Sequence, residues 1–214
     1  MLEDEAKDFV HVLGFSAPDH FVAGDVDEAV RAANTLAYPV ALKVLSPDIP
    51  HKTDVGGVRT GLRTSEDVRR AYDEMMDAVA RQAPDARIHG VLVEQMADPG
   101  LELIVGGIRD PQFGPVVMFG MGGVFAEVLR DVAFRLAPLA KEEALEMIRE
   151  IRVAELLKGF RGSPPIDADA VAGTICRLGG LLTVFEDVAE VEFNPLLAYP
   201  EGPPTVADVR VALK

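Results

Sequence analysis

Short runs of β-branched and aliphatic residues recur along the whole chain and alternate with amphipathic segments. Most runs span only five to nine residues and are bounded by glycine, proline or polar residues, which is typical of strands. Because the chain contains both strand-like runs and helix-like amphipathic segments, an all-helical fold and an all-strand fold are excluded. The pattern predicts strands at residues 40–45, 57–63, 88–95, 102–108, 115–119, 133–137, 190–198 and 206–211.

The amphipathic segments carry apolar residues three or four positions apart, which predicts helices. These helices are expected at residues 3–13, 27–37, 64–79, 141–158 and from 167 or 169 to 185. Residues 106–111 join two strands through a turn typical of a hairpin. We therefore expect an α+β fold with antiparallel or mixed sheets. The turn-rich stretch at residues 97–100 predicts two domains, at residues 1–97 and 98–214.

Charge and cysteine content narrow the possible partners and the compartment. A net charge of −14 argues against binding to nucleic acid or to an anionic membrane, because both are polyanions. A nucleotide is still acceptable, since a few local cations, backbone N–H groups and Mg²⁺ suffice to hold it. An acidic start, no long apolar run and the single Cys176 predict a cytoplasmic chain without signal peptide, membrane helix or intrachain disulfide.

The first candidate site follows the strand at residues 40–45. Lys43 stands inside that apolar strand, either to present a cation to a phosphate or on an exposed face. In the following loop, Gly56 and Gly57 form either an anion-binding nest of backbone N–H groups or an ordinary turn. His51, in the same loop, is a candidate nucleophile or general base.

A second glycine-rich loop, Phe119-Gly120-Met121-Gly122-Gly123, also follows a strand. It is not a dinucleotide-binding fingerprint, because Phe125 takes the place of the third glycine, and it lacks the Gly-Lys-Ser/Thr of a phosphate-binding P-loop. The loop either contacts phosphate or is a structural turn.

Acidic and amide side chains supply candidate metal and ribose contacts. Glu192 and Asn194 alternate with apolar residues and therefore share one face of a strand. If the strand holding Asp208 pairs with it, Asn194 and Asp208 converge and offer oxygen ligands suited to Mg²⁺. The alternative is the solvated face of an edge strand. Glu94 and Glu102 flank the expected domain boundary and either contact a ribose or an adenine amine or are ordinary surface acids.

Taken together, four blocks of sequence resemble one known family. Residues 38–58, Val93-Glu94-Gln95-Met96, residues 119–139 and residues 190–196 are similar, in this order and spacing, to the ATP-grasp domain of ADP-forming acyl-CoA synthetases. The similarity covers essentially the whole chain, and the same domain is related to the β subunit of succinyl-CoA synthetase. It implies an ATP-grasp fold, in which two α+β lobes clamp a nucleotide.

The resemblance also implies an activity. The chain would be the nucleotide-binding β subunit of an acid–CoA ligase, or an excised domain of one. It would transfer a phosphoryl group between a phosphohistidine and ADP or ATP with Mg²⁺. The histidine would belong to a CoA-binding α subunit, without which the enzyme is incomplete. Two alternatives stay open, namely another ATP-grasp carboxylate ligase and a non-catalytic nucleotide-sensing module.

Individual residues take roles from the same resemblance. Lys43 would meet the nucleotide phosphates, and Gly56 and Gly57 would lie in the loop that closes over them. Glu94, Gln95 and Met96 would form the hinge strand beside adenine. Glu102 would contact the ribose, and Gly122 and Gly123 would line the approach of the phosphohistidine loop.

The remaining implied roles concern the metal and the transfer step. Asn194 and Asp208 would hold Mg²⁺. Glu192 matches the acid that steadies the incoming phosphohistidine in the succinyl-CoA synthetase relatives. His51 matches a histidine proposed in some ADP-forming synthetases to be a second phosphorylation site. Glu192 and His51 are therefore the expected catalytic residues.

Overall fold

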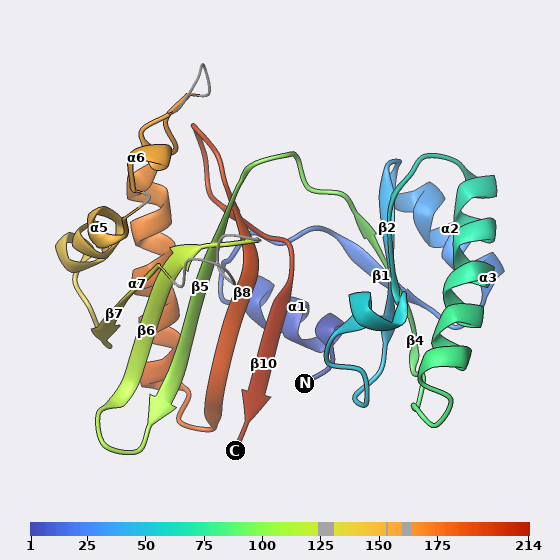
Figure 1. Cartoon of the computed structure of the whole chain (residues 1–214), viewed down its shortest axis with the longest axis horizontal. Helices are drawn as coiled ribbons and strands as arrows, with labels where there is room; N and C mark the ends of the chain where they lie inside the picture. Colours follow the sequence, from blue (N-terminus) through green and yellow to red (C-terminus); the bar gives the residue numbers. More distant parts are fainter. Residues whose placement is uncertain (124–130, 153, 160–163) are drawn as a thin grey trace. The chain divides into compact units, whose positions relative to one another are not determined.

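The computed structural model describes residues 1–123, 131–152, 154–159 and 164–214 (Figure 1). These residues combine helices with antiparallel sheets, as expected for an α+β fold. They divide into two compact units. The four-stranded unit contains Leu2–Asp8 and Pro18–Asp98, and the six-stranded unit contains Met1, Phe9–Ala17 and Pro99–Lys214. Within the described ranges, no helix is long and apolar enough to cross a membrane.

The four-stranded unit is built on a sheet with the strand order β1-β4-β2-β3, and every neighbouring pair is antiparallel. Its central strand β2 is buried at all six positions, which explains why its sequence is almost continuously apolar. The strands are β1 (His20–Ala23), β2 (Val40–Leu45), β3 (Val58–Leu62) and β4 (Gly90–Gln95).

Two helices, α2 (Val26–Leu36) and α3 (Ser65–Gln82), pack against each other and against this sheet (Figure 1). Both begin at a side-chain cap, because Asp25 and Thr64 accept hydrogen bonds from N–H groups three residues later. Between β2 and β3 the chain forms the short 3₁₀ helix η1 (Lys52–Val55).

The six-stranded unit contains an antiparallel sheet with the order β10-β8-β5-β6-β7, and β9 also pairs with β8. Helices α5 and α7 pack on each other and on its strands. The strands are β5 (Leu101–Asp110), β6 (Gly114–Met121), β7 (Val132–Leu136), β8 (Val188–Ala198), β9 (Thr205–Val206) and β10 (Val209–Leu213). The helices are α5 (Lys141–Glu150), α6 (Ala154–Leu157) and α7 (Ala168–Val184). Helix α1 (Glu3–Val12) contributes residues to both units.

The hairpin of β5 and β6 forms, but its turn lies later than expected. Gly106 and Gly107 are inside β5 and pair with Met118 and Val117, and the chain reverses after Asp110. The Asp110 carboxylate accepts hydrogen bonds from the N–H groups of the next turn residues, which stabilises the reversal there. Gly107 serves packing instead, since a methyl group there would overlap the side chains of two leucines of α7.

Three further elements differ from the expectations. The strand β1 was not expected, because only one of its four residues is buried and no apolar alternation marks it. The helix expected over residues 141–158 is interrupted, because Ile151 adopts an extended conformation and is buried. The last expected strand divides into β9 and β10, which leaves Asp208 between two strands.

Candidate functional site

Lys43 is buried in the four-stranded unit rather than exposed. Its side chain is 10% exposed, and its ammonium group lies 2.7 Å from Glu3 Oε1 and 2.8 Å from Glu94 Oε1. Of the two sequence interpretations, the exposed face is therefore wrong. A lysine costs much free energy to bury without a partner, and the two carboxylates supply that compensation.

Two more lysines extend these contacts into a chain of alternating charges. Lys7 Nζ lies 3.0 Å from Glu94 Oε2, and Lys52 Nζ lies 3.0 Å from Glu3 Oε2. The order is therefore Lys7, Glu94, Lys43, Glu3 and Lys52, which we call the charge cluster. All five residues belong to the four-stranded unit. With three ammonium groups and two carboxylates, the cluster carries a net positive charge in an acidic chain.

Glu3 shows how strongly the cluster acts on its members. Burial raises the pKa of its carboxyl group, but the ammonium groups of Lys43, Lys52 and Lys7 lower it more. The pKa falls from the ordinary 4.5 to about 2. Glu3 is therefore ionised over the whole physiological range and acts as a permanent counter-ion.

Sequence reasoning missed Glu3, Lys7 and Lys52 as site residues. A signal was present, because Glu3 and Lys7 are four residues apart and share the helix face that buries Ala6 and Val10. Charged residues on the apolar face of an amphipathic helix are unusual and indicate buried ion pairs. Their partners on β2 and β4 are distant in sequence, and no local pattern shows them.

The glycine pair after β2 forms a closed turn. The N–H groups of Gly56 and Gly57 donate to the carbonyl groups of Thr53 and Lys52, at 3.1 and 2.7 Å. Gly56 has a left-handed backbone, with φ of 68°. The turn interpretation therefore describes this conformation, in which both N–H groups are already used. Contact of these groups with a phosphate requires the turn to open. His51 is exposed and precedes η1.

Gln95 and Met96 follow Glu94 at the end of β4. Gln95 is exposed, and its N–H group donates to the Asp19 carbonyl at 3.0 Å. The Met96 N–H group donates to the Pro39 carbonyl at 3.1 Å. The expected hinge residues thus continue directly from a member of the charge cluster.

The six-stranded unit brings Glu102, Gly122 and Gly123 together. The Gly122 N–H group donates to the Glu102 carbonyl at 2.9 Å, and a methyl group on Gly123 would overlap the Glu102 carboxylate. The end of the exposed Glu102 side chain can move aside, but the φ of 60° at position 123 favours glycine. The rest of this loop, residues 124–127, lies outside the described residues.

Asn194 and Asp208 also meet in the six-stranded unit. Strands β8 and β10 pair antiparallel, and the Asn194 N–H group donates to the Asp208 carbonyl at 3.1 Å. The Asn194 side-chain amide lies 3.3 Å from Glu192 Oε1, so these two side chains share a face as expected. Because β8 lies between β5 and β10, the edge-strand interpretation is wrong. Their role in binding a metal is still a prediction.

Pro195 does not end β8, although proline is usually found at strand edges. The strand continues to Ala198, and its pairing with β5 shifts between Leu103 and Val105, next to the proline. This irregularity accommodates the missing N–H group. The Pro195 carbonyl still accepts a hydrogen bond from Ala207 at 3.1 Å.

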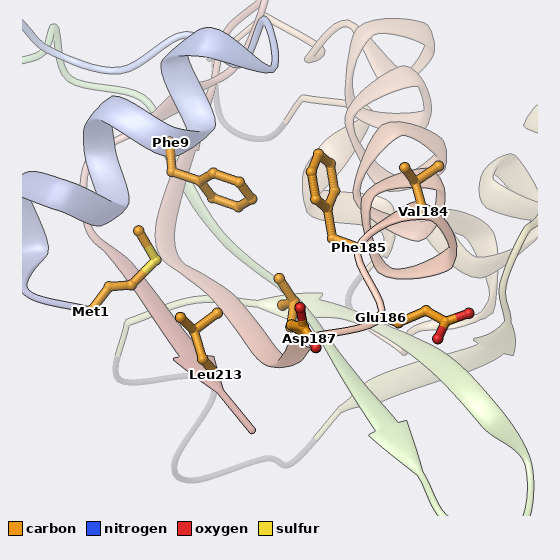
Figure 2. A pocket seen from close by; sticks show the side chains of 8 residues that line it. Met1, Phe9, Val184, Phe185, Glu186, Asp187 and Leu213 are labelled. Carbon is orange, nitrogen blue, oxygen red and sulfur yellow. The ribbon is translucent and has the colours of Figure 1, made fainter.

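A hollow of about 470 Å³ lies elsewhere in the six-stranded unit (Figure 2). Phe9 and Phe185 both line it and pack edge to face, with ring centroids 5.5 Å apart and the rings nearly perpendicular. None of the site residues expected from the sequence lines it. Among the described residues, no three His, Cys, Asp or Glu side chains form a ready-made metal site.

Comparison with known proteins gives a consistent result. The pattern of the ATP-grasp domain family matches residues 1–213. The β subunit of ADP-forming acetate–CoA ligase I from Pyrococcus furiosus is 43% identical over 213 residues, which cover 100% of this chain and 91% of that protein. The ADP-forming acetate–CoA ligase I of Archaeoglobus fulgidus is 44% identical, and the match covers 98% of this chain but 30% of that longer protein.

Solved structures agree. Dinucleotide-forming acetyl-coenzyme A synthetase 1 of Ca. Korarchaeum cryptofilum, in complex with coenzyme A, Ca-AMPCP and HgCl⁺, superimposes with a TM-score of 0.97 and 46% identity. The match covers 100% of this chain and 93% of the solved one. A second structure of that enzyme, with coenzyme A and Mg-AMPPCP, gives a TM-score of 0.86 and 42% identity, covering 100% and 92%. The chain therefore belongs to the ATP-grasp domain family.

Proposed function

We propose that this chain is the nucleotide-binding β part of an ADP-forming acyl-CoA synthetase. The observation that carries the proposal is the buried Lys43 ammonium group inside a net positive charge cluster. Identity to acetate–CoA ligase β subunits over the full chain supports it. A structure of the Korarchaeum enzyme, in which the phosphohistidine segment points towards the nucleotide binding site, supports the same reaction.

The proposed step is a reversible phosphoryl transfer. In the direction of ATP synthesis, the P–N bond of a phosphohistidine breaks and a P–O bond forms to a terminal oxygen of ADP. The histidine leaves neutral after taking up a proton. Such a transfer depends on positioning and charge neutralisation. Lys43 would neutralise phosphate oxygens, and Glu192 would accept a hydrogen bond from the incoming histidine.

The oxygen donors of the six-stranded unit fit a hard divalent cation. We assign the Mg²⁺ contacts to the side chains of Asn194 and Asp208, whose backbones are joined by a hydrogen bond next to the pairing of β8 and β10. When bound, Mg²⁺ neutralises charge on the phosphate oxygens. Glu102, with Gly122 and Gly123 packed against it, would contact the ribose.

The remaining proposed roles concern the loops. Gln95 and Met96 would lie along the adenine, and Gly56 and Gly57 would approach the phosphates once their turn opens. His51, exposed at the start of η1, would serve as a second phosphate acceptor.

A CoA-binding partner completes the proposed enzyme. In the Archaeoglobus relative, the region similar to this chain is 30% of a longer protein, whereas the Pyrococcus relative is a separate subunit. We propose that the partner of this chain carries the CoA site and the histidine. The net charge of −14 supports a function without nucleic acid or membrane surface, and a cytoplasmic location completes the proposal.

Calorimetric titration of the full chain with ADP and ATP, with and without Mg²⁺, tests this proposal. Wild-type protein should bind with clear Mg²⁺ dependence. Asp208→Ala should weaken Mg-ADP binding by about tenfold or more, which is about 1.4 kcal/mol. Asp77→Ala removes an equal charge from the exposed face of α3 and should leave binding unchanged. A wild-type chain that binds neither nucleotide would contradict the proposal.

A further inference from the structure

We infer that Glu3 is a positioning residue, which places the ammonium groups of Lys43 and Lys52 side by side for a polyphosphate. The inference rests on the proposed function of Lys43. Glu3 Oε1 lies 2.7 Å from Lys43 Nζ, and Glu3 Oε2 lies 3.0 Å from Lys52 Nζ. One carboxylate therefore binds two lysines from different segments, one from the strand β2 and one from η1.

The surroundings of Glu3 hold its side chain in place. Its side chain is 2% exposed, and the N-terminal part of α1 places it against the four-stranded sheet. One turn later on the same helix, Lys7 is completely buried and pairs with Glu94, which is the second partner of Lys43. The helix thus contributes one charge of each sign, and both charges act on the surroundings of Lys43.

The two lysines would separate without this carboxylate. Ammonium groups repel each other, and Glu3 is the shared counter-ion that offsets the repulsion. Lys52 is the more exposed of the two, at 18% of its side chain, and belongs to a short 3₁₀ segment. A lysine side chain gains much rotamer freedom on release. Loss of the Glu3 charge should therefore release Lys52 first, while Lys43 keeps its contact with Glu94.

A pair of adjacent cations suits a ligand that carries negative charge on neighbouring phosphates. A single point charge attracts any anion, whereas two ammonium groups at a set separation favour a diphosphate. The ligand class is therefore a nucleoside di- or triphosphate. The contribution of Glu3 should be visible for ADP and invisible for adenosine, which has no phosphate.

The test uses the full chain, with Glu3→Gln, Lys52→Met and the double variant titrated with Mg-ADP and with adenosine. Glu3→Gln should weaken Mg-ADP binding by about tenfold and leave adenosine binding unchanged. Because the two residues act through one contact, the double variant should bind Mg-ADP no more weakly than Lys52→Met. Glu5→Gln is the matched control, since Glu5 is an exposed acid of the same helix.

Several results would overturn the inference. Unchanged or tighter Mg-ADP binding by Glu3→Gln would show that Glu3 does not position the lysines. Equal weakening for ADP and adenosine would indicate a general structural loss. Additive effects in the double variant would exclude the shared contact. If Glu3→Gln folds poorly, Lys52→Met still tests the paired cations, since unchanged Mg-ADP binding by Lys52→Met would overturn the inference. Failure of the wild type to bind Mg-ADP would overturn the proposed function, and this inference with it.

Discussion

A buried carboxylate is tolerated only where cations surround it, and Glu3 is such a group. Its local sequence shows an acid at the start of an amphipathic helix, where acids are common. The sequence therefore predicted Lys43 as a cation of interest but neither the burial of Glu3 nor its contact with Lys43. Those contacts join α1 to β2 and β4, and side-chain spacing along one segment cannot reveal a partner in another.

The lowered pKa of Glu3 predicts how the stability of the fold depends on pH. Because the folded pKa of about 2 lies below the ordinary 4.5, the ionised Glu3 stabilises the fold fully above pH 4.5. This contribution decreases as the pH falls below 4.5 and is lost near pH 2. At neutral pH, Glu3→Gln should lower the free energy of unfolding by roughly 3 kcal/mol.

Urea unfolding of both proteins at several pH values measures this difference. The gap between wild type and Glu3→Gln should be constant from neutral pH to 4.5 and should narrow towards about pH 3. Glu5→Gln should show no comparable gap, because Glu5 is exposed. A gap that does not change over this range would mean that the Glu3 charge is not what stabilises the fold.

At the scale of elements, apolar content predicted the strands well where both faces are buried. The expected and observed bounds of β2 coincide, because its short apolar run, broken only by Lys43, is bounded by Pro39 and Ser46. The sequence did not predict the position of the hairpin turn correctly, because tertiary packing determines it. Gly106 and Gly107 look like turn residues in the sequence, but in the structure both lie inside β5, and Gly107 lets α7 approach the strand closely.

The packing of α7 on β5 gives a matched pair of substitutions. Gly107→Ala places a methyl group against the buried Leu178 and Leu182, and the overpacking should cost about 1–3 kcal/mol of stability. Gly180→Ala adds the same methyl group to α7 where no atom lies within 4 Å, and should stabilise by about 0.5–1 kcal/mol.

Thermal unfolding of the two variants beside wild type checks both signs. A lower melting temperature for Gly107→Ala and a higher one for Gly180→Ala are expected. If Gly107→Ala were as stable as wild type, the close approach of the helix to the strand would not require glycine.

At the scale of the whole molecule, the sequence predicted an α+β fold, and the resemblance of four blocks predicted the ATP-grasp family. Those blocks contain most of the predicted site residues, including Asn194, whereas Asp208 and Glu102 lie outside them. The sequence left open that Glu192 and Asn194 lie on an edge strand, and only the complete strand order shows that β8 is internal. Strand order depends on contacts along the entire chain, which a local reading of residues does not contain.

The charge cluster also bears on chemical self-damage. An acyl-CoA synthetase, as we propose this chain to be part of, works with activated acyl groups, and such groups can acylate free amines. Three of the six lysines lie in the cluster, where burial and contacts with carboxylates shield the ammonium groups from such reagents. At the exposed Lys141, the hydrogen bond with Asp169 raises the pKa of the ammonium group.

Exposure of the chain to acetyl phosphate, followed by peptide mass spectrometry, should show this protection. The Lys158 side chain is 67% exposed, and the glutamate that it contacts is exposed as well. Lys158 should therefore be acetylated well before the buried Lys7 or Lys43. Early acetylation of Lys43 would contradict the expectation. The same ion pairs that position the lysines for phosphate binding would thus protect them from the acyl donors of the proposed reaction.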